Sequence, residues 1–110
     1  MEIGLDRHDQ NMVVALKGRL DVLASRDLEA QLTTVIDVGI TTLIIDMSNL
    51  EYIGSAGLGI LVTMGKKVRA NGGDMVFASA DPNLVKILEI CGVTKLFKVV
   101  ASTRDALAAN

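Results

Sequence analysis

The chain has 110 residues, which is enough for one domain with a single core and too few for two. Its formal net charge of -2 argues against a nucleic-acid-binding surface, which would need a basic patch. No apolar run approaches the ~18 residues of a membrane span, and the N-terminus lacks the basic start and apolar stretch of a signal peptide. We therefore expect a cytoplasmic protein that binds neither nucleic acid nor membrane.

Two local features have structural interpretations. Cys91 is the only cysteine, so no internal disulfide and no thiolate metal cluster can form. We expect it to be buried on the apolar face of a helix. Lys66, Lys67 and Arg69 lie close together on one predicted helix and are best explained as a solvated face.

The first part of the chain predicts a hairpin followed by a helix. Residues 2–8 form a weakly alternating strand and residues 12–17 a clear one, close enough together to pair. A helix over residues 26–38 follows, with Ser25 as its N-cap. Gly39 stands where a left-handed residue ends a helix.

The middle of the chain combines a buried strand with an unusual helix start. Residues 41–47 form a strand whose unbroken apolar centre indicates burial on both faces. A second helix then begins with Ser55 as its expected N-cap and continues to about Arg69. Gly57 and Gly59 occupy its first turn, where each costs about 1 kcal/mol relative to alanine. We expect these glycines to leave a bare backbone that another molecule can approach closely.

The last part predicts two more strand–helix pairs. A strand over residues 74–78 precedes a helix that Asp81 caps, with Pro82 at its first position and Gly92 at its end. The expected buried face of this helix consists of Leu84, Ile87, Leu88 and Cys91. A short strand over residues 96–100 and a Ser-Thr-Arg-Asp sequence resembling a capping box complete the chain.

The alternation of strands and helices predicts the fold class. Helices between successive strands indicate crossover connections and a mostly parallel sheet, to which the hairpin adds an antiparallel edge strand. We therefore expect one α/β domain over residues 1–110, with about four helices.

The sequence gives little support for catalysis. Ser55 on a strand-to-helix turn is similar to the G-x-S-x-G arrangement of hydrolases, but Ile53 stands in place of the first glycine. The single histidine, His8, belongs to the predicted sheet edge and has no reason to face the serine. Because no paired carboxylates or metal-spaced cluster offers another chemistry, we expect a protein that is not an enzyme.

Three other roles for Ser55 stay open. The glycine-rich helix start could bind the phosphate of a free nucleotide, although its glycine order matches neither known phosphate-binding pattern. Ser55 could itself be phosphorylated, since a helix N-terminus tolerates the added negative charge. It could also be only a helix cap.

The residues after Ser55 favour a docking surface. Ile60 and Met64 form an apolar pair one helical turn apart, off the predicted buried stripe, with Thr63 beside them. Exposed Ile and Met side chains beside a glycine-lined helix start are typical of a partner-binding surface.

Several segments of the chain resemble the STAS domains of bacterial anti-sigma factor antagonists. Residues 18–21 (Gly-Arg-Leu-Asp) are similar to the family's G-E-L-D, and residues 52–59 (Tyr-Ile-Gly-Ser-Ala-Gly-Leu-Gly) are similar to F/Y-x-D-S-x-G-L-G. Further similarity lies in residues 43–47, 72–73, 91–93 and 96–97. The resemblance extends over nearly the whole chain.

The resemblance implies a partner switch. In such a system the unphosphorylated antagonist binds an ATP-dependent serine kinase of the ATPase fold, which doubles as an anti-sigma factor, and thereby frees the sigma factor. Phosphorylation of the serine, here Ser55, weakens the complex, and a PP2C-type phosphatase restores it. By the same resemblance, Asp21 lies beside Ser55 and contributes to the kinase contact.

The residues above and the resemblance together define the expected site. Neither a cofactor nor a metal is expected. The expected partner-binding residues are Asp21, Gly54, Ser55, Ala56, Gly57, Leu58, Gly59, Ile60, Thr63 and Met64. The chain departs from the family at Gly54, where the pattern has aspartate, so the loss of a carboxylate could alter kinase recognition. A STAS module with a non-sigma target, or a nucleotide- or anion-sensing domain, is the alternative interpretation.

Overall fold

A five-stranded sheet forms the centre of the computed structural model, which describes residues 1–108. Its strands are β1 (Glu2–His8), β2 (Asn11–Leu20), β3 (Thr42–Ile53), β4 (Asp74–Ala78) and β5 (Lys98–Val100). The strands follow one another across the sheet in chain order. The pair β1–β2 is an antiparallel hairpin and the other neighbours are parallel. This confirms the predicted α/β class and its antiparallel edge.

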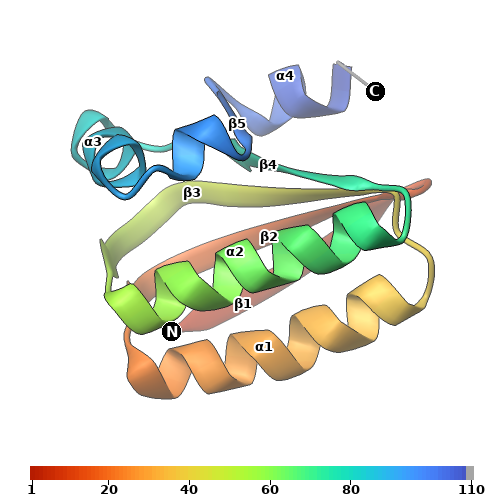
Figure 1. The fold of residues 1–110 in the computed structure, drawn as a ribbon, viewed down its shortest axis with the longest axis horizontal. Helices are drawn as coiled ribbons and strands as arrows, with labels where there is room; N and C mark the ends of the chain where they lie inside the picture. Colours follow the sequence, from red (N-terminus) through yellow and green to blue (C-terminus); the bar gives the residue numbers. More distant parts are fainter. Residues whose placement is uncertain (109–110) are drawn as a thin grey trace.

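Helices cover both faces of the sheet. They are α1 (Val22–Asp37), α2 (Ser55–Ala70), α3 (Pro82–Ile90), the short 3-10 helix η1 (Val93–Lys95) and α4 (Thr103–Ala108). In Figure 1, α1 and α2 run side by side along one face, whereas α4 lies on the other side of the sheet. No helix within residues 1–108 combines the length and the hydropathy needed to cross a membrane.

The apolar centre of β3 contributes to the core on both faces, as predicted. Leu43 and Ile45 are fully buried in the main cluster beneath α1 and α2. Ile44, also fully buried, packs on the opposite face in a smaller cluster that includes Ala106 of α4. A continuous apolar run therefore marks a strand with no solvent-facing side.

Helix α1 begins earlier than predicted, so the Ser25 cap is wrong. The N-cap is Asp21, whose carboxylate accepts a hydrogen bond from the backbone N–H of Ala24 at 2.9 Å. Ser25 is instead buried within the first turn, and its hydroxyl donates to the carbonyl of Asp21 at 2.6 Å. The prediction missed this because Asp and Ser cap equally well, and the chain turns into the helix directly after β2. Gly39 has the expected left-handed backbone, with φ of 87°.

Helix α3 has the predicted start and a narrower buried face. The Asp81 carboxylate accepts from the N–H of Leu84 at 2.8 Å, and Pro82 is the first helical residue. Only Leu84 and Leu88 of the four expected core residues are buried. Ile87 is 37% exposed, and Cys91 is exposed, because this nine-residue helix lies at the edge of the core and presents one stripe to it. The expected burial of Cys91 is therefore wrong.

Candidate functional site

The carboxyl ends of β2 and β3 bring Asp21 and Ser55 to one edge of the sheet. Leu20 pairs with Ile53 in the parallel ladder, and the N–H of Gly54 donates to the carbonyl of Leu20 at 3.1 Å. Asp21 directly follows β2 and Ser55 stands two residues after the end of β3, so both residues lie at this edge of the sheet. In open parallel sheets this edge is the usual place for a functional site.

Ser55 is not the N-cap of α2, contrary to the prediction. Gly54 holds that position with an extended backbone (φ -92°, ψ 173°), and no side chain caps the helix. The serine is instead the first helical residue, and it is exposed. Its hydroxyl is therefore not required to start the helix, which weakens the interpretation of Ser55 as only a cap.

Gly57 allows close packing within the chain and does not provide bare backbone for a partner, contrary to the prediction. It is buried, and a Cβ atom added there would lie 2.5 Å from Cγ of Leu20 and 3.0 Å from its carbonyl oxygen. The missing side chain lets the first turn of α2 sit directly on the end of β2. A Cβ at Gly59 would meet nothing within 4 Å, so only this second glycine leaves open surface.

The predicted exposure of Met64 in the apolar docking pair is also wrong. Met64 is 1% exposed, and its sulfur lies 3.9 Å from the hydroxyl of Thr33 on α1. Ile60 is half-buried and packs against the main core. Met64 contacts α1 because the two helices run side by side on the sheet, which the pattern of a single helix does not reveal. Thr63 is exposed, as expected.

The other predicted site residues are either buried in the core or accessible to solvent. Leu58 is 9% exposed and belongs to the main core. The predicted site residues that are accessible to solvent are Asp21, Gly54, Ser55, Ala56, Gly59, Ile60 and Thr63, of which Gly54, Ala56 and Ile60 are partly buried.

One pair beside Ser55 was not predicted. The guanidinium carbon of Arg19 lies 4.3 Å from the ring centroid of Tyr52, its partner across the β2–β3 ladder. A Cβ atom at Gly54 would lie 3.1 Å from the hydroxyl oxygen of Tyr52, which is 41% exposed. A side chain at position 54 would therefore require the tyrosine to shift slightly. The sequence signal was present, because Arg19 and Tyr52 each stand two residues before a predicted site residue.

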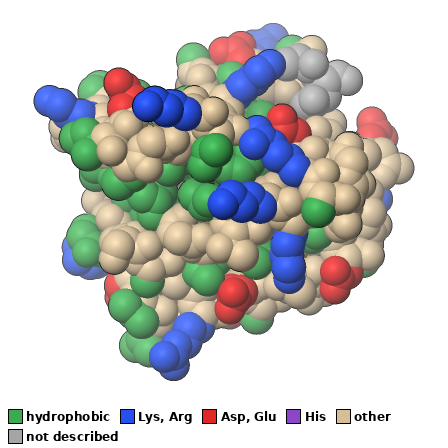
Figure 2. All heavy atoms as spheres, viewed as in Figure 1, with side chains coloured by type: hydrophobic (Ala, Val, Ile, Leu, Met, Phe, Trp, Pro, Cys, Tyr) green, Lys and Arg blue, Asp and Glu red, His purple; other side chains and the backbone are tan. Residues whose placement is uncertain are grey.

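An open apolar groove of about 600 Å³ extends from Ser55 between α2 and α3. Its lining residues are Ile53, Gly54, Ser55, Leu58, Gly59, Val62, Ile87, Cys91 and Val93. Figure 2 shows hydrophobic side chains gathered in the hollow between these helices, with Lys and Arg side chains along its edge. The sequence pattern does not reveal this groove, because its two walls come from segments that are far apart in the chain.

The one histidine within residues 1–108, His8, lies far from Ser55. His8 pairs with Asn11, at the opposite end of β2 from Leu20, and hydrogen-bonds to Asp6 at 2.8 Å. At ~3.3 Å per strand residue, it lies roughly 30 Å from the Ser55 end of the sheet. Within residues 1–108, no three His, Cys, Asp or Glu side chains form a candidate metal site.

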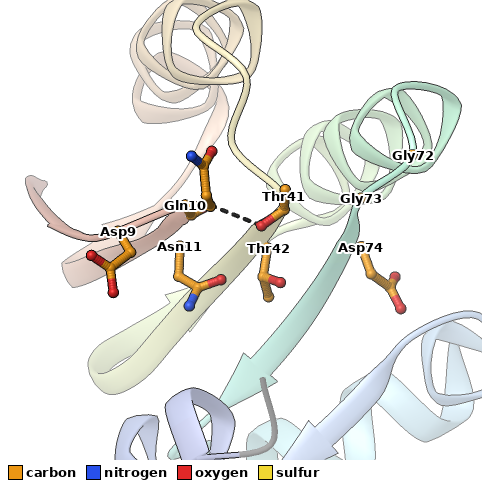
Figure 3. Close-up of a pocket in the computed structure, with 8 residues that line it drawn as sticks. All are labelled: Asp9, Gln10, Asn11, Thr41, Thr42, Gly72, Gly73 and Asp74. Atoms are coloured by element: carbon orange, nitrogen blue, oxygen red, sulfur yellow. Dashed lines mark hydrogen bonds between the residues drawn. The ribbon is translucent and has the colours of Figure 1, made fainter.

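A polar hollow at the other edge of the sheet has a structural explanation. Figure 3 shows its lining residues at the amino ends of β2, β3 and β4: Asp9, Gln10, Asn11, Thr41, Thr42, Gly72, Gly73 and Asp74. The hydroxyl and N–H of Thr41 both donate to the carbonyl of Gln10, at 3.2 and 2.8 Å. These bonds tie neighbouring turns together. The hollow lies at the opposite end of the parallel strands from Ser55.

The fold and the site define a class of protein. The family model described as STAS domain matches residues 2–106, and the chain belongs to this family. BtrV of Bordetella bronchiseptica, provisionally named as an anti-sigma factor antagonist, is 31% identical over 109 residues, which are 99% of this chain and 93% of BtrV. The anti-sigma-B factor antagonist of Bacillus subtilis is 25% identical, with 97% of this chain and 99% of that protein covered. Neither name describes an enzyme.

Solved structures agree with this assignment. An anti-sigma factor antagonist from Mycobacterium paratuberculosis matches with a TM-score of 0.89 and 28% identity, covering 98% of this chain and 92% of that one. The unphosphorylated form of the anti-sigma factor antagonist SpoIIAA matches with a TM-score of 0.80 and 21% identity, covering 98% and 96%. At that identity, the second match concerns the fold alone.

Proposed function

We propose that this protein is an anti-sigma factor antagonist whose partner is an anti-sigma factor with serine kinase activity of the ATPase fold. In this proposal the unphosphorylated chain binds the kinase through the edge of the sheet that carries Asp21 and Ser55, called the Ser55 edge below. Phosphorylation of Ser55 releases the kinase. A PP2C-type phosphatase then restores the binding form. The observation that carries the proposal is the exposed hydroxyl of Ser55 at the first position of α2, where it takes no part in capping.

The chemistry of a helix start is compatible with such a modification. A phosphate on Ser55 would add about -1.5 to -2 charges beside the positive end of the α2 dipole, which favours anions. The fold should therefore tolerate the group. A partner seated on the same edge would meet both its charge and its bulk. Relatives named as anti-sigma factor antagonists support this choice of partner.

The test is a paired capture experiment with Ser55→Asp and Ser55→Ala. Wild type and both variants serve as baits in extract from the native cell, and the recovered kinase is then purified for binding measurements. We expect Ser55→Asp to bind at least about tenfold more weakly. Its melting temperature should stay within about 3 °C of wild type.

Ser55→Ala is the matched control, since it removes the hydroxyl without adding charge. It should keep both stability and binding, because Ser55 does not cap α2. Equal binding by wild type and Ser55→Asp would show that Ser55 does not control the complex. Mass spectrometry of wild type incubated with the kinase and ATP should place one phosphate on Ser55.

A further inference from the structure

The groove between α2 and α3 is an apolar surface that adjoins Ser55. It begins at Ser55 and Gly59, and its floor continues over Val62 on α2 and Ile87 on α3. Ile90, one turn beyond Ile87, is 77% exposed. Apolar side chains are thus left in contact with water directly beside a polar site.

Two exposed lysines stand close in the chain to residues that line the groove. Lys66 lies one helical turn after the lining residue Val62 and therefore on the same side of α2. Lys95 follows the groove residue Val93 by two positions in η1. Both lysines are exposed, and neither forms an ion pair within residues 1–108. Arg69, the next basic residue on this side, is already engaged by Asp74 at 2.9 Å.

We propose that this groove receives an apolar segment of the same kinase, with acidic side chains that face Lys66 and Lys95. The inference rests on the proposed function and deepens it by naming the chemistry of the partner's contact. An open groove of this shape suits a helix laid along it with its apolar face down. The unpaired lysines beside the groove favour a segment with acidic side chains.

The groove also gives phosphorylation a physical route to release. Ser55 is part of its lining. A phosphate there would place a strongly hydrated charge against the apolar contact, and burying that charge without a partner is unfavourable. The apolar segment would therefore leave when Ser55 is modified.

Cys91 provides a direct readout, because it is the only cysteine, is exposed and lines the groove. The measured quantity is the rate at which N-ethylmaleimide alkylates Cys91, followed by mass spectrometry of this chain. The rate is compared between the free protein and the saturated kinase complex. We expect the rate to fall at least about tenfold in the complex, as for a contact that excludes water. A Cys91→Ser, Val38→Cys variant is the control, since Val38 is 58% exposed at the end of α1. Its rate should not change.

A charge swap tests the acidic segment. Lys66→Glu should weaken kinase binding by about tenfold, and Lys66→Arg should preserve it. Lys67→Glu makes the same change one residue away, off the groove side of α2, and should have less than about a twofold effect. Melting temperatures of all three variants show whether any of them fails to fold.

The outcomes separate this inference from the proposed function. If Cys91 is alkylated rapidly in a saturated complex that Ser55→Asp disrupts, the kinase does not occupy the groove. The proposed control of binding by Ser55 would still stand. Equal losses from Lys66→Glu and Lys67→Glu would overturn the acidic segment. If alkylation of the free protein slows as its concentration rises, a second copy fills the groove and the proposed occupant is wrong. Loss of the Ser55→Asp effect would instead refute the proposed function.

Discussion

Gly57 and Gly59 are two residues apart in the first turn of α2 and have opposite structural roles. A Cβ at Gly57 collides with Leu20, whereas one at Gly59 meets nothing within 4 Å. We expect Gly57→Ala to lower the free energy of unfolding by about 1–3 kcal/mol, because it overpacks a tight contact. Gly59→Ala should raise it by up to about 1 kcal/mol through helix propensity. Urea unfolding of the two variants measures both changes.

The same two alanine variants also test the proposed kinase-binding surface. Gly59 borders the proposed partner surface, so a methyl group there can hinder docking while it stabilises the helix. Gly57 is inside the chain and should affect binding only through stability. A Gly57→Ala variant as stable as wild type would show that the close approach of α2 to Leu20 is not required.

The start of α1 combines a cap with a candidate partner contact in one residue. The Asp21 carboxylate accepts from the N–H of Ala24, and Asp21 lies beside the Ser55 edge. Asp21→Asn keeps a capping side chain and should change stability by less than about 0.5 kcal/mol, whereas Asp21→Ala should cost about 1 kcal/mol. Thermal unfolding measures this difference.

The same two variants test whether the charge of Asp21 contributes to kinase binding. If it does, Asp21→Asn should bind about tenfold more weakly even though the helix is intact. Unchanged binding of this variant would restrict Asp21 to its role as a helix cap. The pair therefore separates the helical role from the binding role, which an alanine substitution alone cannot do.

At the scale of the whole molecule, the helix α4 packs on the face of the sheet opposite α1 and α2, away from the proposed partner surface at Ser55. Ala106 of α4 is 1% exposed and packs with Val13, Ile44 and Ala78 on the face opposite α1 and α2. Ala106→Asp would bury a carboxylate among these residues and should cost at least about 2 kcal/mol of unfolding free energy. Kinase affinity, measured well below the melting temperature, should stay within about twofold of wild type.

A large loss of affinity in the folded Ala106→Asp protein would contradict this separation. It would mean that the α4 face and the Ser55 edge are coupled through the sheet. Far-ultraviolet circular dichroism at the binding temperature provides the necessary control, since it shows whether the variant is folded when affinity is measured.

The sequence by itself determined the order of the five strands and the four α-helices, but not the short 3-10 helix η1. Apolar runs such as residues 43–45 marked buried strands, and Asp81 with Pro82 marked the start of α3, because these signals act within a few residues. The motif around Ser55 also identified the family, which the match over residues 2–106 confirms. Local chemistry was sufficient for these conclusions.

Only the tertiary structure decided which side chains of the site are exposed. Met64 is hidden by α1, and Gly57 is covered by the end of β2, although each followed a pattern typical of a binding surface. The groove likewise requires α2 and α3 to meet, and these helices are separated by a strand and a turn. Exposure depends on what packs from elsewhere in the chain, and a periodic pattern within one helix carries no information about that neighbour.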